Sequence, residues 1–190
     1  MPRPDPDDYF MQIALAVRSR ANCTGRRVGA IIVRDRRILS TGYNGTPSGM
    51  RNCEDGGCHR CSHPESYAPG EGYDICICVH AEQNALLAAA RFGVAVEDCT
   101  IYTTLQPCFG CLKELLQANV REVCYMQPWE SRFGAQYAML VERLRESEPA
   151  PIPRFRRIPI VDPDAGWALG RAGDSGERTL GHEVLDADGP

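Results

Sequence analysis

Residues 79–90 read VHAEQNALLAAA, and this stretch decides how the rest of the chain is interpreted. Its leucines and alanines predict a helix that packs against a core, from about His80 to Phe92. His80 and Glu82 are unusual at the start of such a helix, because polar side chains are costly to bury without partners. Their presence predicts that another part of the chain supplies groups that interact with them.

The stretch QPCFGCLKELLQA, residues 106–118, supplies these groups. Pro107 stands where a helix would begin, and Cys108 and Cys111 lie three residues apart on one face of its first turn. A helix N-terminus favours a thiolate over a thiol, because its N–H groups and its dipole stabilise negative charge. Two thiolates and the imidazole of His80 therefore form a ligand set for zinc.

Three protein ligands leave the fourth tetrahedral position of zinc to water, which is typical of a catalytic site. Glu82 would reach this water without binding the metal and would transfer its protons. A lone Cys-x-x-Cys could instead be a redox pair or half a zinc knuckle, and a lone histidine could simply cap a helix. The combination of His-x-Glu with Pro-Cys-x-x-Cys is more specific, since zinc-dependent nucleobase deaminases share it.

The first part of the chain predicts a helix followed by a hairpin. Residues 7–21 have apolar side chains at helical spacing, with Asp7 or Asp8 as the cap. Residues 27–33 and 37–43 are strand-like runs separated by a polar turn, so they predict two antiparallel strands.

Strands and helices alternate after residue 90. Strands are expected at residues 99–105 and 121–126, and helices from Cys108 and over residues 135–145. This alternation predicts an α/β fold with a largely parallel sheet covered by helices. Residues 154–161 are expected to add a last strand.

The chain is expected to divide at residue 148. Residues 1–148 would form a catalytic domain with a cysteine-rich insert at about residues 46–79, which needs a metal or another constraint to hold it. Residues 149–190 would form a C-terminal extension that is partly flexible, especially after Asp162, because Pro, Gly and Asp are frequent there.

Composition excludes several classes of partner. The formal net charge of −4 and a pI of about 5.6 indicate no basic surface for a long nucleic acid. The sequence has no run of about 20 apolar residues, so no membrane span is expected. The N-terminal residues lack the basic-then-apolar order of a signal peptide, so a cytoplasmic location is expected.

Ten cysteines in such a chain favour metal binding over disulfide bonds. Cys99 and Cys124 stand alone in predicted strands and are expected to be small buried apolar residues. A redox-sensitive disulfide is the alternative for the clustered cysteines, and His59 and His63 are alternate ligands. The candidates for at least one structural zinc are Cys23, Cys53, Cys58, Cys61, Cys76 and Cys78.

The chain resembles the deoxycytidylate (dCMP) deaminase family of the cytidine deaminase superfamily over most of residues 9–130. The order GYNG, cysteine-rich insert, HAE is more similar to this branch than to riboflavin-pathway or tRNA adenosine deaminases. The resemblance implies a three-layer α-β-α fold with a mixed sheet of about five strands. It rests on the stretches VGAIIV, STGYNGTPSG, VHAEQNALLAAARFG and YTTLQPCFGCLKELLQANV.

The resemblance implies hydrolysis of dCMP to dUMP and ammonia by zinc-activated water, with Glu82 as the proton shuttle. It assigns the catalytic zinc to His80, Cys108 and Cys111. Asn44 of GYNG would contact the sugar, and the backbone of the TTLQP segment would line the base pocket.

Further substrate contacts are expected at three positions. Thr104 belongs to the segment that would line the base pocket. Arg27, with its neighbour Arg26 as the alternative, and Arg91 are candidates to meet the 5′-phosphate. For each arginine, the alternative is an ordinary solvent-exposed side chain.

Related dCMP deaminases hold a second zinc with residues that match Cys23 and Cys53, and with positions just before HAE, where Cys78 lies. The additional Cys58 and Cys61 depart from this pattern, so the ligands and the number of structural zincs stay open. The resemblance also implies a homo-oligomer and nucleotide effectors, dCTP and dTTP.

Two other functions are compatible with the sequence. The chain could deaminate CMP, a 5-substituted dCMP, dCTP or a cytosine compound of a specialised pathway, because the zinc-site residues act only on the amidine part of the base. It could also be a non-catalytic, zinc-stabilised interaction module. Glu82 argues against the module, since a structural site has no use for a free carboxylate.

Overall fold

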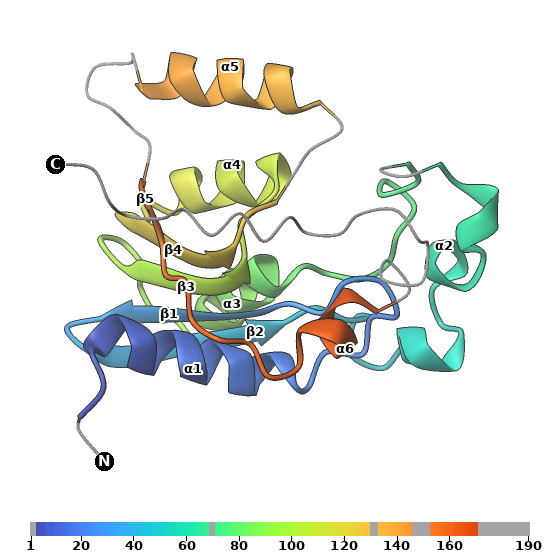
Figure 1. Cartoon of the computed structure of the whole chain (residues 1–190), viewed down its shortest axis with the longest axis horizontal. Helices are drawn as coiled ribbons and strands as arrows, with labels where there is room; N and C mark the ends of the chain where they lie inside the picture. Colours follow the sequence, from blue (N-terminus) through green and yellow to red (C-terminus); the bar gives the residue numbers. More distant parts are fainter. Residues whose placement is uncertain (1–2, 69–70, 130–132, 146–152, 171–190) are drawn as a thin grey trace, which may run out of the picture.

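A five-stranded mixed sheet organises the protein. The computed structural model describes residues 3–68, 71–129, 133–145 and 153–170 (Figure 1). The strand order is β2-β1-β3-β4-β5. β1 pairs antiparallel with β2 and β3, whereas β3–β4 and β4–β5 are parallel, so the sheet is less parallel than the alternation of elements predicts. The strands are β1 (Gly29–Arg34), β2 (Arg37–Tyr43), β3 (Thr100–Leu105), β4 (Glu122–Gln127) and β5 (Arg154–Arg157).

Helices cover both faces of this sheet (Figure 1). The insert between β2 and α3 contains only short helical turns in its described residues, η1 (Cys53–Asp55), α2 (His59–Ser62) and η2 (Pro64–Ser66). Among the described residues, no helix is long and apolar enough to cross a membrane. The remaining helices are α1 (Pro6–Arg18), α3 (Ala81–Arg91), α4 (Phe109–Gln117), α5 (Gly134–Arg145) and α6 (Ala165–Leu169).

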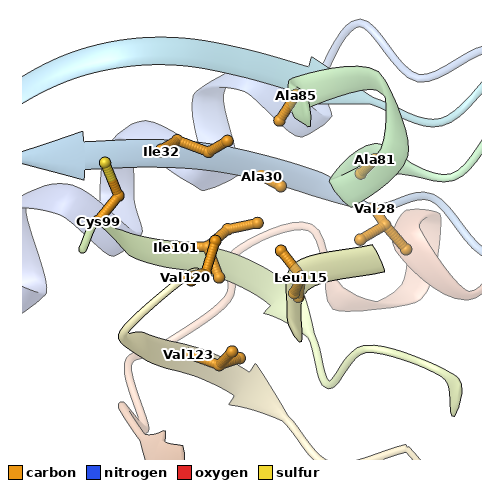
Figure 2. Close-up of a cluster of buried hydrophobic side chains, with 10 residues drawn as sticks. All are labelled: Val28, Ala30, Ile32, Ala81, Ala85, Cys99, Ile101, Leu115, Val120 and Val123. Atoms are coloured by element: carbon orange, nitrogen blue, oxygen red, sulfur yellow. The ribbon is translucent and has the colours of Figure 1, made fainter. Parts of the chain in front are cut away.

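The alternation of side chains along β1 divides the core in two, because successive residues of a strand point to opposite faces. Ile31 and Val33 pack in a cluster with α1. Ala30 and Ile32 pack in a second cluster with residues of α3 and α4 (Figure 2). The predicted three-layer arrangement of helices, sheet and helices is confirmed.

Helix α3 lies unusually close to the sheet at Gly42 of β2. A Cβ atom at this position would lie 2.2 Å from the carbonyl oxygen of Ala81, so only glycine fits there. The Ser40 hydroxyl donates a hydrogen bond of 2.7 Å to the carbonyl of Ala85 one turn further along. These contacts fix the start of α3, which carries His80 and Glu82, against the hairpin.

The N-cap of α1 differs from the sequence-based prediction. Asp5, not Asp7 or Asp8, accepts a hydrogen bond from the Asp7 amide, and Pro6 occupies the first helical position. Proline fits there because its missing N–H needs no partner in the first turn. The Asp7 carboxylate instead accepts hydrogen bonds from Tyr102 and Arg156.

The described part of the C-terminal segment packs against the rest of the fold. β5 is shorter than the predicted strand because Pro159, which has no N–H to donate, follows it closely. Beyond it, Asp162 accepts two hydrogen bonds of 2.6 Å from Arg18 of α1, and a short helix follows at Ala165–Leu169 where flexibility was expected. Residues 171–190 lie outside the described residues.

Candidate metal centre and active site

The N-termini of α3 and α4 bring together the three predicted zinc ligands. His80 is the N-cap residue of α3, Cys108 is the N-cap residue of α4, and Cys111 lies in the first turn of α4. Their ligand atoms lie within 4.8 Å of one another. His80 Nδ1 is 3.3 Å from the sulfur of Cys111 and 3.6 Å from that of Cys108.

A side-chain bridge joins the two helices beside this centre. The Gln83 side chain accepts a hydrogen bond of 3.0 Å from the His80 amide and donates one of 2.8 Å to Glu114. Gln83 belongs to α3 and Glu114 to α4. The bridge therefore holds the histidine-bearing helix against the helix that carries both thiols.

Without a cation, the two thiols cannot both ionise easily. Hydrogen bonding from Cys111, followed by His80, lowers the pKa of Cys108 to about 4. The same contact with Cys108, together with burial, raises the pKa of Cys111 far above its ordinary value. One nitrogen and two sulfur donors are the ligand types that zinc prefers, and a divalent cation would stabilise both thiolates, so the residues fit zinc.

Glu82 lies directly beside the three ligands. Its side chain is buried, with only 4% of the residue exposed. One carboxylate oxygen accepts a hydrogen bond of 3.6 Å from the Cys111 thiol, and the other accepts one of 3.2 Å from the Thr103 hydroxyl. Burial, which disfavours the charged form, raises the pKa of Glu82 above its ordinary value.

Thr103 and Thr104 point to opposite faces of β3. Thr103 lies on the side of Ile101, which packs against α3, and its hydroxyl contacts Glu82. The side chain of Thr104, whose backbone is predicted to line the base pocket, accepts a hydrogen bond of 3.1 Å from the Gly29 amide. Thr103 belongs to the TTLQP segment whose backbone was predicted to line the base pocket, but no role was predicted for its side chain, although the two-residue period of the strand distinguishes the faces of the two threonines.

The predicted sugar contact, Asn44, is buried at the end of β2. Its side chain accepts a hydrogen bond from the Val28 amide and donates one to the carbonyl of Arg26, each of 2.7 Å. These bonds use one of the two donors of the amide group, so one N–H and one oxygen lone pair remain for a ligand. The next residue, Gly45, exchanges backbone hydrogen bonds with Val79, immediately before His80.

The two predicted phosphate contacts lie in different parts of the fold. The Arg27 guanidinium lies 4.5 Å from the ring centroid of Trp167 and donates a hydrogen bond to the Trp167 carbonyl. Within the described residues, the buried Nε of Arg27 has no hydrogen-bond partner. Arg91 is exposed at the C-terminal end of α3, about 14 Å along the helix axis from Glu82.

A separate group of thiols lies in the insert and the segments beside it. His59 and His63, the alternate ligands, are exposed and stack on each other at 4.3 Å between ring centroids. Cys99 and Cys124 are fully buried in the two apolar cores, as expected. The grouped cysteines are Cys23, Cys53, Cys58, Cys61, Cys76 and Cys78.

Comparison with known proteins identifies the family. Residues 4–127 match the model of the cytidine and deoxycytidylate deaminase zinc-binding region. The chain therefore belongs to the deoxycytidylate deaminase family, within the cytidine deaminase superfamily. The resemblance seen in the sequence motifs is confirmed.

The deoxycytidylate deaminases of two fungi and of a phage are similar in sequence to this chain. The chain is 44% identical over 127 residues to the deoxycytidylate deaminase of Saccharomyces cerevisiae, covering 67% of this chain and 39% of that protein. It is 45% identical over 123 residues to the enzyme of Schizosaccharomyces pombe, covering 65% of this chain and 37% of that protein. The match to the deoxycytidylate deaminase of Mycobacterium phage D29 is 40% over 131 residues and covers 66% of this chain and 97% of that protein.

A solved structure agrees in fold. The dCMP deaminase of cyanophage S-TIM5, known in apo form and in complex with dCMP and dUMP, superposes with a TM-score of 0.59 at 26% identity. The match covers 83% of this chain and all of the phage chain.

Proposed function

We propose that the protein is a hydrolase that converts dCMP and water to dUMP and ammonia. One observation carries the proposal: a buried carboxylate, that of Glu82, lies 3.6 Å from the sulfur of Cys111, next to a set of one imidazole and two thiols. A carboxylate beside the ligand set that is not itself a ligand is suitably placed to exchange protons with water there. The family to which the chain belongs, and the names of its relatives, support a cytosine nucleotide as substrate.

His80, Cys108 and Cys111 would hold the catalytic zinc. When bound, zinc would supply a Lewis acid that lowers the pKa of water. The Gln83–Glu114 bridge would keep the ligand-bearing helix ends together. At least one further zinc would stabilise the insert.

Glu82 would move the protons of the reaction. Deamination must deliver a proton to the ring nitrogen of cytosine and another to the departing amine, and a carboxyl group can do both in turn. The burial of Glu82, with only 4% of the residue exposed, would keep these transfers away from bulk water. The Thr103 hydroxyl, 3.2 Å away, would orient the carboxyl group.

Substrate binding would use Asn44 of the GYNG segment, the backbone at Thr104 and an arginine. Asn44 would contact the sugar with its remaining amide hydrogen, and the backbone at Thr104 would line the base pocket. Arg27 is a better phosphate candidate than Arg91, because its Nε is buried without a partner among the described residues, and because it adjoins Val28, which Asn44 binds.

A nucleotide panel tests the proposal. The zinc-loaded protein is incubated with dCMP, CMP, dCTP and 5-methyl-dCMP, and ammonia and the product nucleotide are measured. We expect the highest kcat/KM with dCMP. Preference for another nucleotide would replace the substrate but keep the reaction, whereas no ammonia from any of them would favour a non-catalytic module.

Several broader properties stay predictions. These are a homo-oligomeric state, effector binding by dCTP and dTTP, a cytoplasmic location, and a catalytic domain at residues 1–148 that carries the insert at 46–79. The pairing of β5 with β4 argues for including residues 153–170 in the same folding unit.

A further inference from the structure

The six clustered cysteines form two overlapping groups of four. In each group, the four sulfur atoms lie within 4.8 Å of one another. Cys61 and Cys78 belong to both groups. Cys23 and Cys53 complete one group, and Cys58 and Cys76 complete the other. We refer to these residues together as the six-cysteine cluster.

Four separate segments of the chain converge to build this cluster. Cys23 follows α1, and its neighbour Asn22 binds the Asn52 side chain at 2.8 Å and accepts the Glu54 amide at 3.0 Å. These bonds hold Cys23 beside Cys53. The Gly45–Val79 backbone pair brings in the segment that carries Cys76 and Cys78 from the other side.

A tight turn brings the remaining segment back onto the cluster. At Gly57 a Cβ atom would lie 1.9 Å from the Arg51 carbonyl oxygen, so the turn between Cys53 and Cys58 can close only around glycine. The Gly57 amide donates to the Asn52 carbonyl at 2.9 Å. α2 then carries Cys58 as its N-cap residue and Cys61 within its single turn. Figure 1 shows this insert to one side of the sheet.

The spacing of the sulfur atoms matches zinc–thiolate geometry. A tetrahedral zinc with Zn–S bonds of about 2.3 Å places its sulfur ligands about 3.8 Å apart. The sulfurs of Cys58 and Cys76 are separated by 3.8 Å. Five of the six cysteines are buried, with Cys76 half-buried, and the Thr24 amide donates to the sulfur of Cys53 at 3.4 Å.

The number of thiols decides how many metals fit. Two independent sites with four cysteine ligands each need eight thiolates, and the cluster has six. A single zinc bound by one group would leave two cysteines of the other group next to the metal but not bound to it. Two zincs fit both groups if Cys61 and Cys78 each bind both ions, since a thiolate sulfur has enough lone pairs to bridge two cations.

Charge supports two ions over one. Six thiolates packed this closely repel one another strongly in a buried site, and two Zn²⁺ ions offset four of the six negative charges. The guanidinium of Arg60 interacts electrostatically with Cys61 and Cys76 and offsets part of the remainder.

We propose that the six-cysteine cluster binds a binuclear zinc centre. Cys61 and Cys78 bridge the two ions, Cys23 and Cys53 complete the first tetrahedron, and Cys58 and Cys76 complete the second. This centre would replace the apolar core that the insert lacks, because metal binding supplies folding free energy to small loop-rich segments. It is independent of the catalytic zinc and of the proposed reaction.

Zinc stoichiometry tests the proposal. His80→Ala removes a ligand from the catalytic site, so the zinc content of this full-length variant, measured by mass spectrometry against protein concentration, reports the cluster. We expect two zincs per chain for His80→Ala and three for the unaltered protein. One zinc in His80→Ala would overturn the binuclear centre.

Cysteine variants distinguish terminal from bridging ligands. The double variant Cys58→Ser/Cys76→Ser keeps all four ligands of the first tetrahedron and should lose one zinc. Cys99→Ala, a buried cysteine outside the cluster, is the matched control and should lose none. An unchanged zinc content in the double variant would contradict the second tetrahedron. A disulfide between Cys58 and Cys76 in the unaltered protein, seen as a mass decrease of about 2 Da, would also contradict it.

A bridge is also detectable without any substitution. The unaltered protein is loaded with ¹¹³Cd²⁺ in place of zinc, and its ¹¹³Cd NMR spectrum is recorded. Two of the resonances should be split by coupling to each other through the shared sulfurs. Uncoupled resonances would refute the bridging role of Cys61 and Cys78 even if the zinc content were as expected.

Discussion

Replacing Thr103 by valine should reduce catalysis without disturbing the metal centre. Thr103 is fully buried, and its hydroxyl lies 3.2 Å from one carboxylate oxygen of Glu82 and 3.0 Å from the Leu105 carbonyl. Valine has nearly the same shape but cannot donate a hydrogen bond. A hydrogen bond to a charged group contributes about 1.5–3 kcal/mol, which corresponds to roughly a 10- to 150-fold loss in kcat if the orientation of Glu82 depends on it.

The assay is steady-state deamination of dCMP by zinc-loaded protein, with zinc content and thermal unfolding measured on the same samples. KM and zinc content should stay near their unaltered values, because the single hydrogen of the Thr103 hydroxyl is shared between Glu82 and the Leu105 carbonyl and is not donated to a metal ligand. Thr103→Ser keeps the hydroxyl and should retain most of the activity. If Thr103→Val and Thr103→Ser have the same kcat, Thr103 does not position Glu82.

Two further predictions concern the scaffold. In Asp162→Asn, the buried Arg18 loses a partner whose two hydrogen bonds measure 2.6 Å, so the unfolding free energy should fall by about 3–5 kcal/mol in urea denaturation at pH 7. Burial opposes ionisation of Asp162, but the hydrogen bonds from Arg18 hold its pKa below the ordinary 3.8. The stability difference between the two proteins should therefore persist above pH 4 and shrink as the pH falls through the lowered pKa of Asp162. A stability difference that does not depend on pH would contradict this account. Asn44→Ala leaves the buried Val28 amide without its acceptor, so the unfolding free energy should fall by about 1–3 kcal/mol in the same assay. A rise in KM for dCMP would be the separate sign of the proposed sugar contact. If the variant is as stable as the unaltered protein, Asn44 does not hold this segment in place.

The two motif stretches could be located from sequence because their chemistry is local. The spacing of Cys108 and Cys111, and the position of each motif at a helix start, follow from helix geometry alone. The proximity of His80 to both thiols depends on the tertiary structure. It could still be predicted, because the combination of His-x-Glu with Pro-Cys-x-x-Cys is shared by zinc-dependent deaminases. The strand and helix order could be predicted for the same reason, since hydrophobic periods are local.

Other features depend on contacts that periodicity cannot supply. The two-residue period of β3 separates Thr103 from Thr104, but which face lies against α3 depends on the antiparallel pairing of β1 with β3. The N-cap at Asp5 could have been found, because Pro6 marks the first helical position.

Long-range polar partners were the least predictable features. Arg18 and Asp162 are 144 residues apart, and nothing in either local sequence indicates the pair. The sharing of Cys61 and Cys78 between two groups likewise depends on how the turn at Gly57 and the Gly45–Val79 pair close the insert. Cysteine spacing predicted metal binding there but left the ligand sets open.

The most direct test of the proposed chemistry is the Glu82→Gln variant, assayed for zinc content and for dUMP formation from dCMP. Glutamine keeps the size of the side chain and can still accept the Thr103 hydrogen bond, but it cannot transfer protons. We predict an unchanged zinc content and a kcat lower by roughly 10²- to 10⁴-fold, the usual contribution of a general acid–base group. A variant that binds zinc and forms dUMP at the original rate would contradict the account.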